Sequence, residues 1–191
     1  IDDDFETTPI GSKVFHMVTL GETFDATIRV TDETAASGSH CVKFTDAPGL
    51  DYEFNPHMFF NPSLKNCIAT TSFDLKLEPG AIFWHEWRDN ENPYHVGPSM
   101  GVDAAGQLTA SGQNLLILPH DQWVHFEITC GLGTKLTGKY TLKVTLPDGK
   151  VNTFDDLLCR PKFDRLDYVG FISNAIDKVV FYIDNLKIDR K

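Results

Sequence analysis

The sequence predicts an all-β protein, folded as a two-sheet antiparallel β-sandwich. Apolar and polar residues alternate with a period of two in several segments, which is typical of half-buried strands. Sustained helical periodicity is hard to find. The 14 glycines and 10 prolines divide the 191 residues into short runs. This rhythm favours a sandwich of roughly a dozen or more short strands.

The clearest strands are residues 71–77 and 139–146. In the first, Phe73, Leu75 and Leu77 share one face, and the second alternates in the same way. Turn-forming pairs separate such runs at hairpin distances: Pro79-Gly80, Ala105-Gly106 and Asp148-Gly149.

Two segments break this pattern. Pro48–Pro62 is rich in aromatic residues, Asn and Pro, and we expect an irregular excursion from the sheet. Asp155–Phe163 alternates little, so we expect a loop with a short helical turn. Strands begin near Asp4 and end at Val179–Ile188, so both termini are expected within the sheets. We therefore predict one domain over residues 1–191.

The charge balance argues against several kinds of partner. Seventeen Lys and Arg against 27 Asp and Glu give a net charge of −10, which disfavours nucleic acid and anionic membranes. No apolar stretch reaches the roughly 18 residues of a membrane span. The acidic first residues do not resemble a signal peptide, and we expect a mature protein or a module of a longer one.

Four cysteines permit two disulfides in any of three pairings: Cys41, Cys67, Cys130 and Cys159. Their spacing does not match a zinc-binding pattern. Because Cys130 continues the apolar alternation of residues 124–128, it behaves as a buried small hydrophobe. A domain of this size does not need disulfides, so free buried thiols are slightly favoured over disulfides.

Four segments together resemble a known architecture: Asp3–Glu6, Ser37–Phe44, Trp123–Ile128 and Phe181–Ile188. They are similar to concanavalin A-like or laminin-G-like jelly rolls, including carbohydrate-binding modules of secreted polysaccharide-active enzymes. The resemblance implies two antiparallel sheets and a secreted location, extracellular or periplasmic. It also implies a polysaccharide or oligosaccharide partner, and a tether to a catalytic domain in the full-length protein.

The resemblance further implies a structural calcium ion (Ca2+) beside the paired termini. Its predicted ligands are Asp4, Glu6, Ser39 and Asp184. On a strand, Asp4 and Glu6 project to one side, and a bulge at Asp184-Asn185 would explain why the apolar parity switches there. Calcium prefers such hard oxygen ligands. Alternatively, the first two are solvated surface charges and Asp184-Asn185 ends a strand.

The densest group of recognition-type residues is Trp84–Asp89, followed by Asn92, Tyr94 and His95. Sugar rings need an aromatic platform beside hydrogen-bonding side chains. Trp84 shares the parity of Ile82, so we expect Trp84 to be buried and Trp87 to be exposed. The predicted ligand-binding residues are Trp87, Arg88, Asp89, Tyr94 and His95. Alternatively, Trp87 is a hydrophobe that covers the sheet.

Two further groups are weaker candidates for the ligand surface. His57, Phe59 and Phe60 form a second candidate rim, and core packing is favoured for the two Phe residues. Trp123, with the residues that share its face, could line a sheet, or it caps the edge of the core.

Catalysis is the minority interpretation. Glu86 and Asp89 are three residues apart, so a straight strand sends them to opposite faces, and Asp89 and Glu91 lie in a loop-like run. A pair of carboxylates at the separation required by a retaining glycosidase is not specified. The strand motifs of jelly-roll lyases, Arg-x-Glu or Gln-x-His, are not found either.

The sequence therefore predicts a non-catalytic carbohydrate-binding module for a neutral or weakly charged glycan. Two alternatives stay open. One is a structural or protein-interaction spacer of a multidomain surface protein. The other is a glycoside hydrolase or polysaccharide lyase on the same fold.

Overall fold

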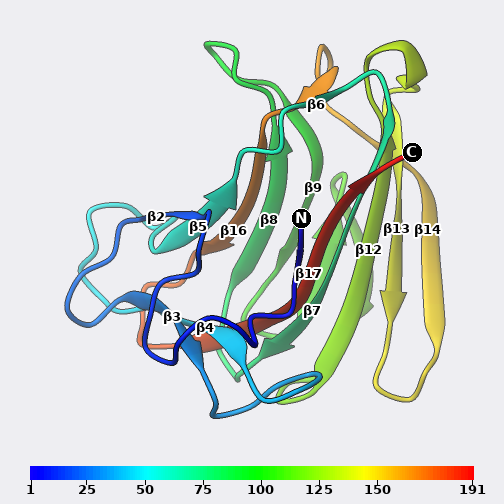
Figure 1. Ribbon diagram of the computed structural model, residues 1–191. Coiled ribbons are helices and arrows are strands. Elements are labelled where there is room, and N and C mark those ends of the chain that lie inside the picture. Colours follow the sequence, from blue (N-terminus) through cyan, green and yellow to red (C-terminus); the bar gives the residue numbers. More distant parts are fainter.

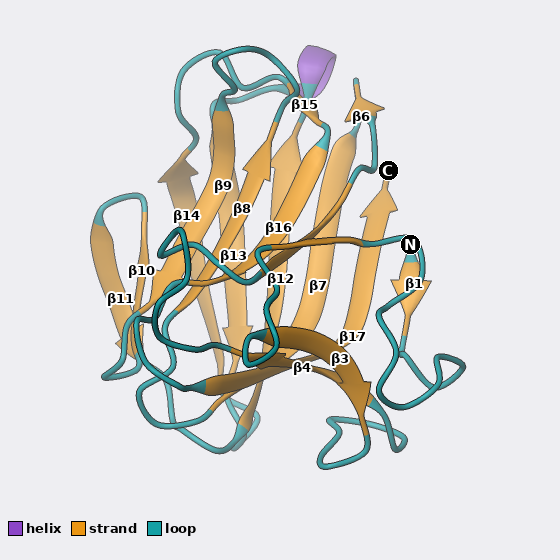
Figure 2. Cartoon of the chain, turned by 90° about the vertical axis from the view of Figure 1, so that its left-hand side faces the viewer, coloured by secondary structure: helices purple, strands orange, loops and turns teal.

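The computed structural model describes residues 1–191 and contains almost only strands and loops. Its single helical element is the short 3₁₀ turn Gly133–Lys135. Two large antiparallel sheets face each other (Figures 1 and 2). The predicted two-sheet β-sandwich is confirmed.

One sheet has eight strands. Its order is β14 (Val151–Leu158), β13 (Lys139–Thr145), β12 (Trp123–Gly131), β7 (Ile68–Leu77), β17 (Val180–Arg190), β4 (Cys41–Thr45) and β3 (Thr27–Thr31), and β1 (Asp2–Asp3) also pairs with β17.

The other large sheet has seven strands. Its order is β11 (Gln113–Ile117), β10 (Gln107–Ala110), β9 (Val96–Val102), β8 (Phe83–Arg88), β16 (Tyr168–Ser173), β5 (His57–Phe60) and β2 (Val18–Leu20). A small two-stranded sheet pairs β6 (Leu64–Lys65) with β15 (Arg165–Leu166).

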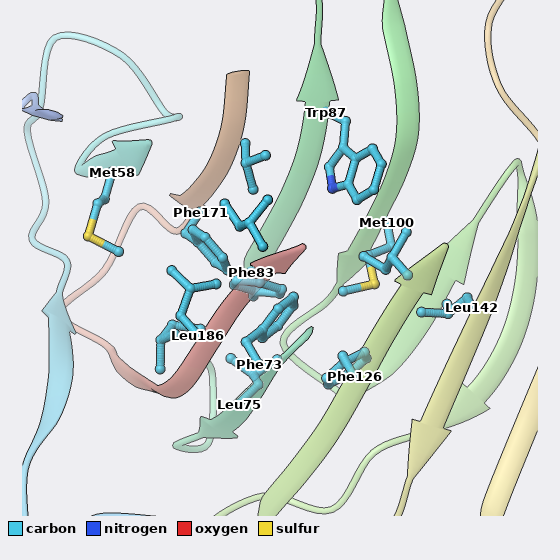
Figure 3. Close-up of a cluster of buried hydrophobic side chains, with 14 of the residues drawn as sticks. Met58, Phe73, Leu75, Phe83, Trp87, Met100, Phe126, Leu142, Phe171 and Leu186 are labelled. Carbon is cyan, nitrogen blue, oxygen red and sulfur yellow. The ribbon is translucent and has the colours of Figure 1, made fainter. Parts of the chain in front are cut away.

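The core fills the space between the two large sheets. Alternate residues of the long strands point into it, as the burial pattern of β7 and β12 shows. Aromatic rings dominate its centre: Phe73 stacks on Phe126 at 5.3 Å between centroids and meets Phe171 edge-on at 5.1 Å (Figure 3). Such offset and edge-on contacts add to the stabilisation from buried area. Each large sheet therefore buries one face against the other sheet, and its other face is turned away from the core.

The first and last strands lie side by side, as expected. Asp2 pairs with Lys187, and Ile1 and Ile188 exchange two backbone hydrogen bonds of 3.0 and 2.9 Å. The register between β17 and β7 shifts after Asp184, and Asn185 has a φ of +49°. The bulge predicted at Asp184-Asn185 is confirmed.

Some connections differ from the prediction. Ala105-Gly106 and Asp148-Gly149 link neighbouring strands, but Pro79-Gly80 links β7 to β8 in the opposite sheet. The helical turn expected in Asp155–Phe163 is absent, because β14 continues to Leu158 and a loop follows. Side chains on both faces of this edge strand are exposed, so its sequence lacks the apolar–polar alternation that predicts a strand.

Candidate functional site: a groove on the seven-stranded sheet

Two adjoining hollows lie on the outer face of the seven-stranded sheet. The first, about 260 Å³, is lined by Phe54, His57, Trp84, Glu86, Arg88, Tyr94, Tyr168, Ile172 and Asn174. The second, about 480 Å³, continues past Trp84 over β9 and β10 to the segment Leu158–Pro161. Because Trp84 lines both, we treat them as one groove.

The β8 strand divides its side chains between core and groove. Phe83, His85 and Trp87 point into the core, whereas Trp84, Glu86 and Arg88 line the outer face. The exposed fraction is 0% for Trp87 and 40% for Trp84, and Figure 3 shows Trp87 among the core side chains.

The predicted roles of the two tryptophans are therefore wrong. Ile82 shares the parity of Trp84, but it is only partly buried and does not belong to the core. The inward alternation begins at the buried Ala81 and continues through Phe83, so the odd-numbered residues face the core.

Trp84 lies against the sheet because its cross-strand neighbour is a glycine. Gly101 of β9 pairs with Trp84, and a Cβ at Gly101 would lie only 3.1 Å from Cε2 of the indole. The missing side chain lets the ring lie close to the backbone and keep one face toward the groove.

Tyr168 is held in the same manner. A Cβ at Gly170, two residues along β16, would lie 2.3 Å from Cε1 of Tyr168, so the ring covers this glycine. Phe59 stacks on the Tyr168 ring at 4.7 Å from the β5 side, and the Arg88 guanidinium lies 4.5 Å from its centroid on the β8 side. The ring is thus fixed from two neighbouring strands.

Arg88 lies between two tyrosines and beside one carboxylate. Its guanidinium is 4.4 Å from the Tyr94 ring centroid and 4.5 Å from that of Tyr168, and Nε donates to Glu86 Oε2 at 2.5 Å. Burial by itself would lower the pKa of Arg88, but the Glu86 charge raises it above its ordinary value. The ion pair of Arg88 and Glu86 therefore adds little net charge to the groove.

An aromatic row continues from Tyr168 toward the loop before β5. Phe59 stacks on His57 at 6.2 Å, His57 meets Phe54 edge-on at 5.9 Å, and Phe54 stacks on Tyr52 at 4.9 Å. Phe54 is 48% exposed. The segment Pro48–Pro62, predicted as an irregular excursion, thus supplies one wall of the groove, but only its first part is a loop, because His57–Phe60 pair with β16 and β2 as strand β5.

The His57 side chain is neutral, and its hydrogen bond shows which ring nitrogen is unprotonated. Burial lowers its pKa below the ordinary value. Nδ1 lies 3.1 Å from the carbonyl oxygen of Phe54, which can only accept, and therefore carries the proton. The other nitrogen, Nε2, keeps its lone pair for a ligand or a proton.

Of the predicted ligand-binding residues, the structure brings Arg88 and Tyr94 together in the groove, and Tyr94 is 51% exposed. Asp89 is buried instead. Its carboxylate accepts from the backbone N–H of His95 at 2.7 Å and approaches His95 Nδ1 at 2.6 Å. Asp89 and His95 therefore close the loop that carries Tyr94 and do not line the hollow.

Sequence reasoning missed Trp84, Phe54 and Tyr168 as groove residues. Tyr168-Val169-Gly170 carried a usable signal, because a tyrosine two residues before a glycine on one strand can lie over it. Trp123 and His125 lie on the outer face of the eight-stranded sheet, away from the groove. Phe60 is buried, as expected, and Phe59 is partly exposed beside Tyr168.

Two of the predicted calcium ligands, Glu6 and Ser39, are in contact. Glu6 Oε1 accepts from the backbone N–H groups of Ser39 and His40 at 2.8 and 2.7 Å, and Ser39 Oγ donates to Oε2 at 2.8 Å. The His40 and Ser39 N–H donors lower the pKa of Glu6. The contact joins the start of the chain to the loop before β4.

Asp184 and Asp4 make separate contacts. The buried Asp184 carboxylate accepts from the N–H groups of Ala36 and Ser37 at 2.8 and 3.2 Å, and burial raises its pKa to about 6. Asp4 Oδ1 accepts from the Glu6 N–H at 3.2 Å. No group of three His, Cys, Asp or Glu side chains is arranged to hold a metal. A cation would have to replace these N–H donors, and the calcium site stays a prediction.

The two facing sheets with their antiparallel order define a concanavalin A-like jelly roll. An endo-β-1,4-glucuronan lyase from the fungus Trichoderma reesei is similar over 100% of this chain and 95% of its own, with a TM-score of 0.69 and 10% identity. The cellulose-induced protein Cip1 is similar over 99% and 96%, with a TM-score of 0.65 and 14% identity.

A lectin from Griffonia simplicifolia is similar over 92% of this chain and 93% of its own, with a TM-score of 0.54 and 9% identity. No family model and no curated protein matches the chain. At these identities the comparisons establish the fold. The structure also has no helix that is long and apolar enough to cross a membrane.

Proposed function

We propose that this domain binds a glycan chain in the groove around Trp84, Tyr168 and Tyr94, without catalysing a reaction on it. The observation that carries the proposal is the arrangement of Trp84 and Tyr168, which come from the adjacent strands β8 and β16 and whose rings each lie over a glycine of the same sheet. Flat, rigid rings suit the apolar C–H faces of sugars, and little conformational entropy is lost when they bind.

Polar groups within the same groove can orient the sugar hydroxyls. Glu86, Arg88 and Asn174 line the first hollow, and Ser99 and Thr109 line the second. Because the two hollows adjoin at Trp84, an extended oligosaccharide fits the groove better than a single sugar. The pairing of Arg88 with Glu86 and the net charge of −10 favour a neutral or weakly charged chain.

The proposed setting is a secreted protein, extracellular or periplasmic, in which this domain is tethered to a catalytic one. Support comes from the fold alone, since the similar structures include a lectin and proteins that act on polysaccharides. In that setting the domain would hold its partner on the substrate, and moderate affinity from a shallow, wet surface would suffice.

The Trp84→Ala variant tests the proposal. We expect wild-type protein to be retarded in affinity gels that contain a neutral polysaccharide, and the variant to lose at least about tenfold in affinity. Trp123→Ala is the matched control, because Trp123 is also partly exposed but lies on the other sheet. Equal binding by wild type and Trp84→Ala would contradict the proposal that the glycan binds in this groove. Retardation by no polysaccharide would favour the spacer interpretation.

A polysaccharide lyase is the second candidate, favoured by His57 and Tyr168 in the same hollow. Several similar structures are polysaccharide lyases. His57 Nε2 could take the proton from the carbon beside a uronate carboxylate. Burial raises the pKa of Tyr168 to about 12, so its phenol keeps a proton for the leaving glycosidic oxygen as the double bond forms.

The two candidates differ in product. A lyase generates unsaturated ends that absorb ultraviolet light, and we expect no such absorbance with uronate-containing polysaccharides. Absorbance that grows with wild type and is lost in both His57→Gln and Tyr168→Phe would replace the binding proposal by the lyase.

The structural calcium ion is proposed separately. Addition of calcium to chelator-treated protein should raise the melting temperature, because a ligand that binds only the folded state stabilises it by mass action. Glu6→Gln should abolish the increase, and Glu53→Gln, an exposed control in a loop, should retain it. A melting temperature that does not change with calcium or chelator would contradict the proposed calcium site.

A further inference from the structure

Two of the four cysteines meet at one end of the groove. The Sγ atoms of Cys130, on β12, and Cys159, directly after β14, are 3.7 Å apart. Cys130 is buried, and Cys159 is partly exposed and lines the larger hollow. Cys41 instead donates to the carbonyl oxygen of Thr34 at 3.0 Å. One of the three pairings that the sequence permits contains a Cys130–Cys159 bond, and the structure brings these two sulfurs together.

The segment that carries Cys159 connects the two sheets. The Cys159 N–H donates to Gly138 O beside β13, and the next N–H, that of Arg160, donates to Val96 O on β9, both at 3.0 Å. Residues 158–161 also form one wall of the larger hollow. A covalent bond between Cys159 and β12 would therefore fix the position of this wall.

We propose that Cys130 and Cys159 are a redox-sensitive pair that closes to an intramolecular disulfide in an oxidising environment and thereby fixes the groove wall at residues 158–161. The two sulfurs are in van der Waals contact, and bond formation requires them to approach by roughly 1.7 Å, to the usual S–S length of about 2.04 Å. The exposed end of the segment at Cys159 can supply this movement. The inference is independent of what the groove binds.

The chemistry assigns different roles to the two thiols. The Cys130 S–H hydrogen bond lowers the pKa of Cys159, and the same shared proton together with burial raises the pKa of Cys130. Cys159 is therefore the attacking thiolate, and the hollow gives a small disulfide such as oxidised glutathione access to it.

In the first step, the Cys159 thiolate attacks one sulfur of oxidised glutathione. The glutathione S–S bond breaks, a mixed disulfide forms at Cys159, and one glutathione thiolate leaves. In the second step, Cys130 loses its proton and attacks Cys159 Sγ, which releases the second glutathione. Two cysteine thiols are oxidised and one glutathione disulfide is reduced, so atoms and electrons balance.

The test uses the full chain, reduced and then treated with oxidised glutathione at neutral pH. We expect two of the four thiols to disappear, the mass to fall by two hydrogen atoms, and peptide mapping to join Cys130 to Cys159. The link closes a long loop that contains β13 and β14, so the melting temperature should rise by roughly 5–12 °C.

Two variants make the outcome specific. In Cys130→Ser the second step is impossible, and one glutathione should remain attached at Cys159. In Cys41→Ser, where the hydroxyl can still donate to Thr34, the disulfide should form as in wild type. The proposal is overturned if four thiols persist in the oxidised wild type, if the mapped link joins other cysteines, or if glutathione is retained by wild type and Cys130→Ser alike.

Discussion

Replacement of Trp87 by alanine is expected to lower the free energy of unfolding by about 3–5 kcal/mol. Trp87 has no exposed surface and is the largest fully buried side chain, so its truncation leaves a cavity in the core (Figure 3). The indole Nε1–H also donates to His85 Nε2 at 3.1 Å, and this buried acceptor would lose its partner.

Chemical denaturation of wild type, Trp87→Ala and Trp84→Ala measures the difference. Trp84→Ala should stay within about 1 kcal/mol of wild type, because Trp84 is 40% exposed on the outer face. Trp87→Phe should lie between the two, since it keeps most of the buried volume and loses the hydrogen bond. A larger loss at Trp84 than at Trp87 would contradict the assignment of core and groove.

Acidification is expected to destabilise the fold through His85. Burial lowers the pKa of this histidine from 6.5 to about 3, so it stays neutral in the folded protein while its unfolded counterpart takes up a proton. As the pH falls below 6.5, the unfolded state binds one more proton than the folded state. The contribution of His85 to stability therefore falls by up to about 1.4 kcal/mol per pH unit and levels off near pH 3.

Comparison with His85→Gln isolates this effect from the other titrating groups. Glutamine offers an acceptor to the Trp87 indole and does not titrate. The free energy of unfolding of wild type minus that of the variant should fall by about 2–3 kcal/mol between pH 7 and pH 4.5. A difference that is constant over this range would mean that His85 is protonated or solvated in the folded state.

The period of the apolar pattern and the spacing of the turn residues predict the β-sandwich, and the resemblance of four segments adds the jelly roll. Phe73, Leu75 and Leu77 face the core as predicted, because one face of this strand is buried and the side chains of a regular strand alternate between its two faces. The parity switch around Asp184 located the bulge for the same reason. These features depend only on neighbours along one strand.

The groove is formed by contacts between residues that are far apart in the sequence, and the apolar pattern along one strand does not predict such contacts. Both parities of residues 82–87 include apolar side chains, so alternation alone could not decide which tryptophan is buried. Phe54 and Tyr168 are far apart in the sequence and meet only through the pairing of β5 with β16. The carboxylate of Asp89 suits a sugar ligand, but Asp89 is buried because the backbone N–H groups of its own loop need an acceptor.

The rings over Gly101 and Gly170 mean that two positions without a side chain set the shape of the groove. A single methyl group at residue 170 would lift Tyr168 from the backbone, and the same change at residue 101 would press against the indole of Trp84. Adding a methyl group at either position would thus reshape the groove while every side chain that lines it stays the same.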